Sequence, residues 1–161
     1  MLRAIYSGGQ TGADLAALIM AKRFGLETGG WMPKGFLNAS GSHPEFAEKY
    51  GIQEHYSPKY PPRTFKNVEI SDATIRFAYT WQSPGELCTL KAIHQYKKPS
   101  IDVDLNNPKP VKEVVEWLTR FNIEVLNVAG NSEHTYTGTC GEVMDYLMQL
   151  FREMGFNENP E

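Results

Sequence analysis

Short apolar runs alternate with amphipathic segments along most of the 161-residue chain. The apolar runs are rich in aliphatic, β-branched and aromatic residues, which is typical of buried strands. Strands are therefore predicted at residues 2–6, 73–79, 101–105 and 125–129. In the amphipathic segments the apolar residues recur at spacings of three and four, which places them on one face of a helix. Helices are predicted at residues 13–24, 63–70, 85–96, 111–121 and 143–154.

One stretch, residues 27–51, interrupts this alternation. It is rich in Gly, Pro, Asn and Ser, and only a short helix at 44–50 is predicted within it. The segment 57–62 that follows is predicted to be loop. Strands that alternate with helices favour a parallel sheet, because each crossover lays a helix over one face of the sheet. The predicted fold class is therefore α/β, a Rossmann-like three-layer sandwich with a mostly parallel sheet.

The length of the chain suits one domain with a full core, and no change in composition divides it. We predict a single Rossmann-like domain over residues 1–156, followed by a disordered tail at 157–161. In folds of this class, ligands bind at the carboxyl ends of the strands. The turns that follow the predicted strands are therefore the first place to look for function.

Charge and cysteine content exclude several classes of function. A net charge of -3 and a pI near 5.8 argue against non-specific binding to nucleic acid, which requires a basic face. Cys88 and Cys140 lie far apart and the four histidines share no metal-ligand spacing, so neither a disulfide framework nor a metal site is indicated. No apolar run approaches the length of a membrane span. We expect a cytoplasmic protein whose partner is a small molecule, with no nucleic-acid or membrane partner.

The turn between the first strand and the first helix carries the strongest signal for a ligand. Ser7, Gly9 and Gly12 stand where the three glycines of a G-x-G-x-x-G turn would be. Such a turn lets a phosphate approach the backbone amides at a helix N-terminus. It is not a Walker A loop, because Ala-Asp replaces Lys-Ser/Thr. The alternative is a tight structural turn in which Thr11 and Asp14 form a capping box.

Three further turns, at 29–35, 83–89 and 127–132, are also rich in small or polar residues. A parallel sheet displays such turns along one edge, so a ligand with one or more phosphates could take amides from two turns at once. The alternative is that α/β turns favour Gly and Asn for conformational reasons alone.

Several side chains near these turns are candidates for contact with a ligand. Lys34 could neutralise an anion and Trp31 could stack on a flat ring, although either could be an ordinary surface or packing residue. Arg63 follows two prolines and has bidentate reach to phosphate or carboxylate, with a surface ion pair as the alternative. The predicted helix at 85–96 begins near Glu86 and Thr89, and the Thr89 hydroxyl could touch phosphate or cap the helix.

Asp72 stands at the start of a predicted strand. It could orient Arg63 or Asn67, or it could cap the end of the preceding helix, and the structural role is favoured.

Six motifs, taken in order, resemble those of the putative molybdenum carrier family. That family is a branch of the SLOG group of Rossmann-like proteins, which also includes the LOG nucleotide phosphoribohydrolases. The resemblance covers almost the whole chain. The motifs lie at residues 7–14, 29–35, 63–68, 71–74, 98–99 and 127–130.

The resemblance implies a binding or carrier protein for a phosphorylated, ring-containing ligand, either a nucleotide or a pterin phosphate such as the molybdenum cofactor. Two alternatives remain: a LOG-like enzyme that cleaves the N-glycosidic bond of a nucleoside monophosphate, with Arg63 and Glu86 as catalytic candidates, and a nucleotide-sensing subunit. Many relatives are oligomers, so we expect a homo-oligomer. The predicted ligand-binding residues are Ser7, Gly8, Gly9, Gln10, Thr11, Gly12, Asp14, Gly30, Trp31, Lys34, Arg63, Asn67, Asp72, Gly85, Thr89 and Gly130.

The chain departs from the family pattern at three places. Asn131, Ser132 and Glu133 replace a Gly-Pro-Arg-x-Ser segment after its glycine, Phe36 replaces a frequent basic residue, and residues 83–86 replace a Gly-Gly-Thr turn. Each lost cation, and the added Glu133, should disfavour a strongly anionic ligand by roughly 1 kcal/mol. Glu86 is also offset from the position of the catalytic glutamate, which counts against hydrolysis.

Overall fold

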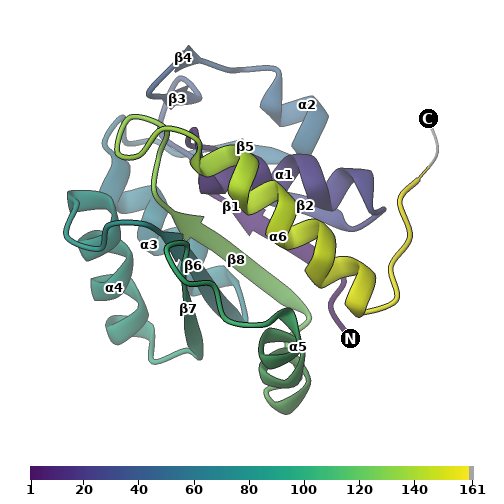
Figure 1. The fold of residues 1–161 in the computed structure, drawn as a ribbon. Coiled ribbons are helices and arrows are strands. Elements are labelled where there is room, and N and C mark those ends of the chain that lie inside the picture. The colour runs from purple at the N-terminus through teal and green to yellow at the C-terminus, as the bar shows by residue number, and fades with distance from the viewer. Residues whose placement is uncertain (160–161) are drawn as a thin grey trace.

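A computed structural model describes residues 1–159 and shows a parallel sheet covered by helices on both faces (Figure 1). The six strands stand in the order β5-β2-β1-β8-β6-β7, and every pairing is parallel. The strands are β1 (Ala4–Ser7), β2 (Glu27–Met32), β5 (Ile52–Glu54), β6 (Ala73–Ala78), β7 (Ser100–Asp104) and β8 (Val125–Gly130). The predicted Rossmann-like α/β class is confirmed.

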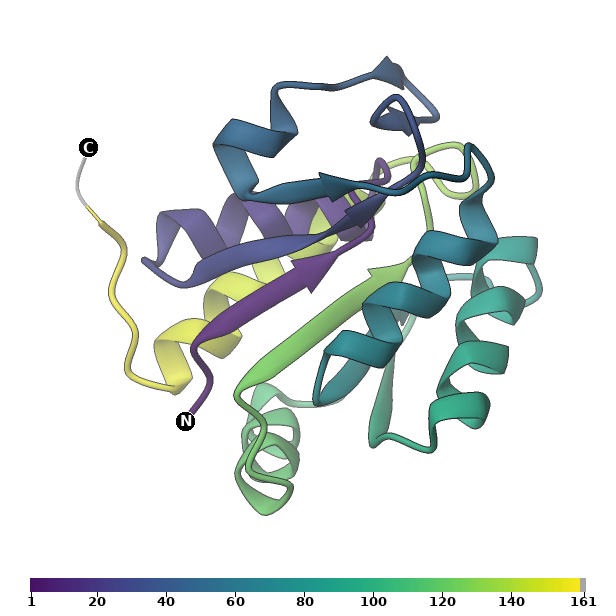
Figure 2. The same ribbon diagram turned by 180° about the vertical axis from the view of Figure 1, so that it is seen from behind.

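The helices divide between the two faces of the sheet. Helices α1, α5 and α6 pack together on one face, and α3 and α4 pack together on the other, as the two opposite views show (Figures 1 and 2). Short α2 lies beside β5 and packs against α1 and β2. The helices are α1 (Ala13–Arg23), α2 (Phe46–Tyr50), α3 (Tyr60–Ile70), α4 (Pro84–Tyr96), α5 (Val111–Arg120) and α6 (Thr139–Glu153).

Within residues 27–51 the predicted short helix at 44–50 is confirmed by α2, but strand β2 and a small hairpin, β3 (Leu37–Asn38) with β4 (Gly41–Ser42), were not predicted. The short strand β5, which follows directly, was also missed. Strand β2 was not predicted because it contains Gly29 and Gly30, and glycine has a low propensity for strands. Gly30 is nevertheless required in this strand, since a Cβ atom there would lie 2.1 Å from the Ser7 carbonyl oxygen of neighbouring β1.

Helix α3 begins at Tyr60, three residues earlier than predicted, and its first turn contains Pro61 and Pro62. Proline is tolerated there because the first amides of a helix have no partner within the helix. Because of this early start, the first turn of α3 faces the carboxyl edge of the sheet, where Tyr60 and Pro61 line a cavity.

The apolar residues of β6 and β8 meet α1, α5 and α6 in the main core. Side chains alternate along a strand, so Ile75 and Phe77 enter this core while Thr74 and Arg76 face the side covered by α3 and α4. The chain therefore buries polar side chains on the α3–α4 side of the sheet, below the site described next.

The C-terminal residues beyond α6 return towards α1. The Asn159 amide donates a hydrogen bond of 2.8 Å to the Arg23 carbonyl, and Arg152 pairs with Glu158 at 3.2 Å. Residues 160–161 of the predicted tail lie outside the described part of the chain. Within residues 1–159, no helix has the length and apolar character that a membrane crossing requires.

Candidate functional site

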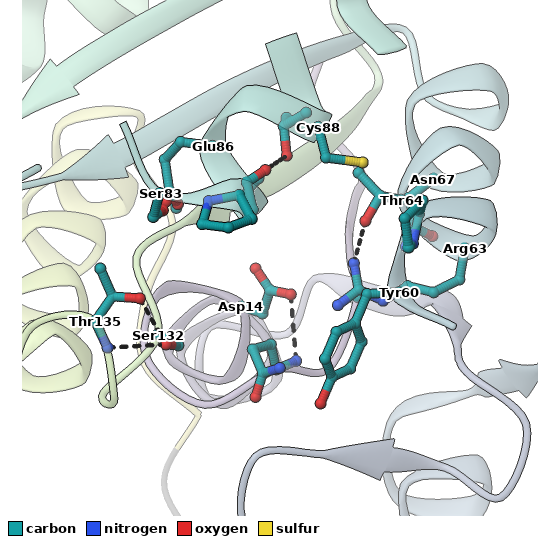
Figure 3. A pocket seen from close by; sticks show the side chains of 18 of the residues that line it. Asp14, Tyr60, Arg63, Thr64, Asn67, Ser83, Glu86, Cys88, Ser132 and Thr135 are labelled. Carbon is teal, nitrogen blue, oxygen red and sulfur yellow. Dashed lines mark hydrogen bonds between the residues drawn. The ribbon is translucent and has the colours of Figure 1, made fainter. Parts of the chain in front are cut away.

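A cavity of about 310 Å³ opens at the carboxyl edge of the sheet (Figure 3). It lies between the turn after β1, the first turns of α1, α3 and α4, the end of β8 and the loop that leads to α6. This is the edge at which parallel α/β folds bind ligands. Its lining residues are Gly8, Gln10, Asp14, Tyr60, Pro61, Arg63, Thr64, Asn67, Ser83, Pro84, Gly85, Glu86, Cys88, Thr89, Asn127, Val128, Ala129, Gly130, Ser132 and Thr135.

The cavity brings together half of the residues that the sequence predicted for ligand binding. Those that line it are Gly8, Gln10, Asp14, Arg63, Asn67, Gly85, Thr89 and Gly130, together with Glu86. Those that do not line it are Ser7, Gly9, Thr11, Gly12, Gly30, Trp31, Lys34 and Asp72.

Asp72 lies at the opposite edge of the sheet, at the start of β6. Its carboxylate accepts hydrogen bonds from the amides of Glu124 (3.0 Å) and Val125 (2.8 Å), where β8 begins. It therefore joins two strands at their amino ends and is too far from the cavity edge to orient Arg63 or Asn67.

Lys34 is exposed. Trp31 contacts this edge through its main chain, which forms hydrogen bonds with Asn67, and not through its indole ring. The Trp31 amide donates to Asn67 Oδ1 at 2.8 Å, and Asn67 Nδ2 donates to the Trp31 carbonyl at 3.0 Å. The indole instead lies 6.0 Å from the His55 ring and beneath Lys66 Nζ, outside the cavity lining. Asn67 thus ties β2 to α3 and also contributes to the cavity wall.

The backbone amides of the turn after β1 are occupied by partners within the chain. Gln10 N donates to Asp14 Oδ2 at 3.2 Å, Gly9 N to Ser7 Oγ at 3.3 Å, and Thr11 N to Gln10 Oε1 at 2.9 Å. Ala13 N donates to the Asn131 carbonyl at 3.0 Å. The Asp14 carboxylate therefore takes the position at which the sequence placed an external anion. The predicted capping box is absent too, because no side chain caps the start of α1.

Two of the glycines in the predicted site are required by packing. A Cβ atom at Gly12 would lie 2.2 Å from the Asn131 carbonyl oxygen, and one at Gly130 would lie 1.9 Å from the Phe77 carbonyl oxygen. Both glycines also have positive φ angles, which disfavour other residues. These positions bring neighbouring backbones together and so fix the shape of the cavity.

Gly8 has a different role, because it leaves space for two charged side chains. A Cβ atom there would lie 2.8 Å from Arg63 Cζ and 2.9 Å from Asp14 Oδ2. The guanidinium of α3 and the carboxylate of α1 therefore approach the same point on the cavity wall. They do not form an ion pair within 4.0 Å among the described residues.

Arg63 is a buried cation with an incomplete set of partners. The residue is only 8% exposed, its Nη1 donates to Thr64 Oγ1, and its guanidinium lies 5.2 Å from the centre of the Tyr60 ring. Its Nε is buried and has no hydrogen-bond partner. Burial lowers the pKa of Arg63, and the nearby Asp14 carboxylate partly opposes this. Arg63 is the one basic side chain among the lining residues of the described chain.

Two buried carboxyl groups face the same cavity. Burial raises the pKa of Asp14 from 3.8 to about 6, against the opposing effects of Arg63 and of hydrogen bonds from the Gln10 and Gly8 amides. Burial likewise raises the pKa of Glu86 from 4.5 to about 6, opposed by hydrogen bonding to Asn131 and reinforced by the Asp14 charge. Both groups therefore change charge just below neutral pH.

Two of the residues that depart from the family pattern, Asn131 and Glu133, have structural roles. Asn131 Oδ1 accepts hydrogen bonds from the amides of Tyr79 (2.8 Å) and Thr80 (3.2 Å), and its Nδ2 donates to the Thr80 carbonyl at 2.9 Å. The Glu133 carboxylate accepts from the Gly138 (2.7 Å) and Cys140 (2.6 Å) amides at the start of α6. Glu133 does not line the cavity, and its charge is stabilised by the helix N-terminus.

Sequence reasoning missed Tyr60 and did not single out Thr64, Ser83, Cys88 or Asn127, although the last three lie in the turns 83–89 and 127–132 that it predicted at this edge. Thr64 lies within the helix predicted at 63–70, but Tyr60 was missed because it was predicted to be loop and not the first residue of α3. The prolines at its second and third positions were the available signal, since proline is frequent at helix starts.

The parallel sheet, with its cavity at the carboxyl edge, defines a Rossmann-like α/β protein. Residues 5–151 match the model of the circularly permutated YpsA SLOG family, and the chain belongs to this family. Its fold is similar to the crystal structure of a putative molybdenum carrier protein from Syntrophus aciditrophicus SB, with a TM-score of 0.84. The two sequences are 35% identical, over 92% of this chain and 94% of that chain. No curated protein matches the chain. The resemblance seen in the sequence is thus confirmed.

Proposed function

We propose that this protein binds a phosphorylated, ring-containing small molecule in the cavity at the carboxyl edge of its sheet. Arg63 is the observation that carries the proposal. A buried charge is costly unless it is paired, and removing one partner of such a pair leaves an expensive unpaired ion. Among the described residues the Arg63 guanidinium donates one hydrogen bond, to Thr64 Oγ1, and at the wall of an open cavity its remaining donors are satisfied most simply by the anionic group of a ligand.

The remaining walls suit the rest of such a ligand. Val128, Ala129, Pro61 and Pro84 provide apolar surface for a flat ring, and the unpartnered Ser83 hydroxyl provides a hydrogen-bonding group at the start of α4. The volume of about 310 Å³ is at the lower end of the usual range for small-molecule sites, roughly 300–1,000 Å³. We infer a ligand about as large as a single nucleotide or the pterin part of a cofactor.

The molybdenum cofactor is one candidate cargo, because the relative of known structure is described as a putative molybdenum carrier protein. The phosphate group of this cofactor would bind the Arg63 guanidinium. Within residues 1–159, no group of three or more His, Cys, Asp or Glu side chains could hold a metal ion. The protein would therefore hold the organic part of this cargo rather than the metal. A nucleotide is the other candidate, and the two are separated by experiment.

The first experiment identifies what the protein retains and then measures binding. Native mass spectrometry of gently purified protein, followed by denaturation, should release a pterin phosphate or a nucleotide. Calorimetric titration with adenosine 5′-monophosphate (AMP), with isolated molybdenum cofactor and with inorganic phosphate then ranks the candidates. Micromolar binding of either ring-containing ligand supports the proposal, whereas no retained ligand and no binding of any probe would refute it.

Two variants test the role of Arg63 directly. Arg63→Met should weaken binding of the preferred probe about 10- to 100-fold, the range expected for a charge-assisted hydrogen bond. Lys34→Met is the matched control, because it removes an exposed cation that does not line the cavity. It should change affinity less than twofold. Equal losses in both variants would show a general charge effect and contradict the assignment.

A second function is favoured by the carboxyl groups of Asp14 and Glu86. Groups whose pKa lies near 6 are suited to acid–base catalysis at neutral pH, and both line the cavity beside Arg63. We infer cleavage of the N-glycosidic bond of a nucleoside monophosphate as the alternative activity. Chromatographic detection of free base after incubation with nucleoside monophosphates tests it, with Glu86→Gln as the inactive control. An inert wild-type protein removes this alternative.

A further inference from the structure

The second buried arginine of the α3–α4 side, Arg76, is placed beneath the cavity in the central strand β6. All residues of β6 are buried, and Arg76 is only 6% exposed. Its Nε and Nη2 donate to the two carboxylate oxygens of Asp102 on β7, at 2.8 and 2.7 Å. Its guanidinium also lies 4.9 Å from the centre of the Trp81 ring. Arg76 is thus held in one orientation from two sides.

The third contact of Arg76 reaches the cavity. Its Nη1 donates to the main-chain carbonyl of Glu86 at 3.2 Å, within the first turn of α4. Unlike Arg63, Arg76 has no buried nitrogen without a partner, and it does not line the cavity. Its charge is already paired with Asp102, so it is not available to the anionic group of a ligand.

Two other side-chain contacts hold the first turn of α4 among the described residues: Thr89 Oγ1 donates to the Gly85 carbonyl at 3.0 Å within the helix, and the Glu86 carboxyl bonds the Asn131 side chain. The N-cap residue of α4 is Ser83, whose hydroxyl makes no capping hydrogen bond and is buried without a partner. Nevertheless, this turn carries Ser83, Gly85 and Glu86 into the cavity wall. A bidentate guanidinium that bonds a carbonyl of this turn fixes it relative to the sheet.

The energetics support a positioning role. Arg76 is buried but the Asp102 side chain is 46% exposed, and an ion pair with one partner in solvent contributes little net stability, so stability alone does not explain the presence of this pair. Its geometry is specific, however, because the planar guanidinium can satisfy Asp102 and the Glu86 carbonyl at the same time.

We propose that Arg76 is a positioning residue, which sets the first turn of α4 and thereby places the Ser83 hydroxyl and the Glu86 carboxyl in the cavity. The part of this proposal that concerns ligand affinity rests on the proposed function. The part that concerns the geometry of α4 does not, and the two are measured separately.

The test uses the full chain with three substitutions. Arg76→Met removes all the hydrogen bonds, Arg76→Lys keeps the charge but cannot bond both partners in the same way, and Asp102→Asn weakens the restraint on the guanidinium. Arg3→Met is the matched control, because it removes a surface ion pair of 3.1 Å with Glu27 at the other end of the sheet. If Arg76→Met does not fold, the other two substitutions still provide the test.

Amide hydrogen exchange gives the first readout. In the Arg76 and Asp102 variants, exchange in residues 83–90 should be at least about fivefold faster, while exchange in α6 stays unchanged. Unchanged exchange in residues 83–90, or an equal increase in α4 and α6, would show a general effect on stability and overturn the proposal.

AMP titration gives the second readout. Arg76→Met should weaken AMP binding about tenfold, Arg76→Lys less, and Arg3→Met not at all. If the wild-type protein does not bind AMP, the nucleotide form of the proposed function fails, and the exchange measurement alone still decides the role of Arg76. If AMP binds and all variants bind it equally, the part of the proposal that concerns ligand affinity is refuted.

Discussion

Replacing Asp14 by asparagine should stabilise the protein at neutral pH, although it removes a hydrogen-bonded carboxylate. The residue is 7% exposed, and burial raises its pKa from 3.8 to about 6. The folded chain therefore binds more protons than the unfolded chain between these pH values. The free energy of unfolding falls as the pH rises from about 4 to about 6, and it stays low above that range.

The magnitude follows from the shift in pKa. At 1.36 kcal/mol per pH unit, the rise from 3.8 to about 6 corresponds to about 3 kcal/mol of stability that is absent at pH 7. An asparagine side chain at this position would carry no charge, and its oxygen could still accept from the Gln10 amide, which bonds Asp14 Oδ2 at 3.2 Å in the wild type. We expect Asp14→Asn to gain about 2–3 kcal/mol at pH 7 and almost nothing at pH 4.

Urea denaturation at pH 4, 5, 6 and 7 measures this difference. The effects of titrating groups that Asp14 does not influence cancel between the two proteins, whereas loss of the Asp14 charge also lowers the pKa of Glu86. Asp145→Asn, an exposed position on α6, is the control and should change stability by less than about 0.5 kcal/mol at every pH. If Asp14→Asn were less stable than the wild type at pH 7, or if its advantage were the same at pH 4, the assignment of Asp14 as a buried, destabilising anion would be wrong.

Three further substitutions separate packing from ligand binding. Gly130→Ala should cost about 3 kcal/mol or more in urea denaturation, because its Cβ atom would lie 1.9 Å from the Phe77 carbonyl oxygen at a φ of 150°. Gly141→Ala in α6, which has open space around it, is the control and should instead gain about 0.5–1 kcal/mol. Asp72→Asn should lose about 1–2 kcal/mol of stability and leave AMP affinity unchanged. A loss of AMP affinity would show that Asp72 does contribute to ligand binding. Glu133→Gln should lower the melting temperature through α6 and change AMP affinity less than twofold, whereas a large gain in affinity would show that its charge reaches the ligand.

The glycine turn after β1 shows how far a local pattern can be trusted. The sequence identified the turn correctly as part of the cavity edge, since Gly8 and Gln10 line the cavity. The sequence could not show that the Asp14 carboxylate accepts a hydrogen bond from the Gln10 amide of this turn. An aspartate in the first turn of a helix is equally consistent with an exposed side chain and with a buried one that bonds the turn. The choice depends on burial, which arises from packing by distant residues.

Arg63 and Arg76 likewise show that the ion pairing of a charged residue cannot be predicted from the local sequence. In the sequence, Arg63 stands out because two prolines precede it, whereas Arg76 is one polar residue in a strand. In the fold, Asp102 pairs with Arg76 from a neighbouring strand, and no carboxylate lies within 4.0 Å of Arg63 among the described residues. Pairing between residues that are far apart in the chain has no local signature.

By itself, the sequence determined the succession of helices and of strands β1, β6, β7 and β8, the parallel α/β class, the family, and the edge of the sheet at which a ligand would lie. The elements, the class and the edge follow from the periodicity of apolar residues and from turn residues, which act over a few neighbouring positions, whereas the family follows from the resemblance of six motifs. Only the tertiary structure decided that the glycine-rich stretch at 27–32 is a strand, that Asp14 fills the amide turn and that Arg63 remains without a carboxylate partner within the described residues. Each of these depends on burial and on contacts between segments distant in sequence, which set the free energy of a charge or an unpaired polar group.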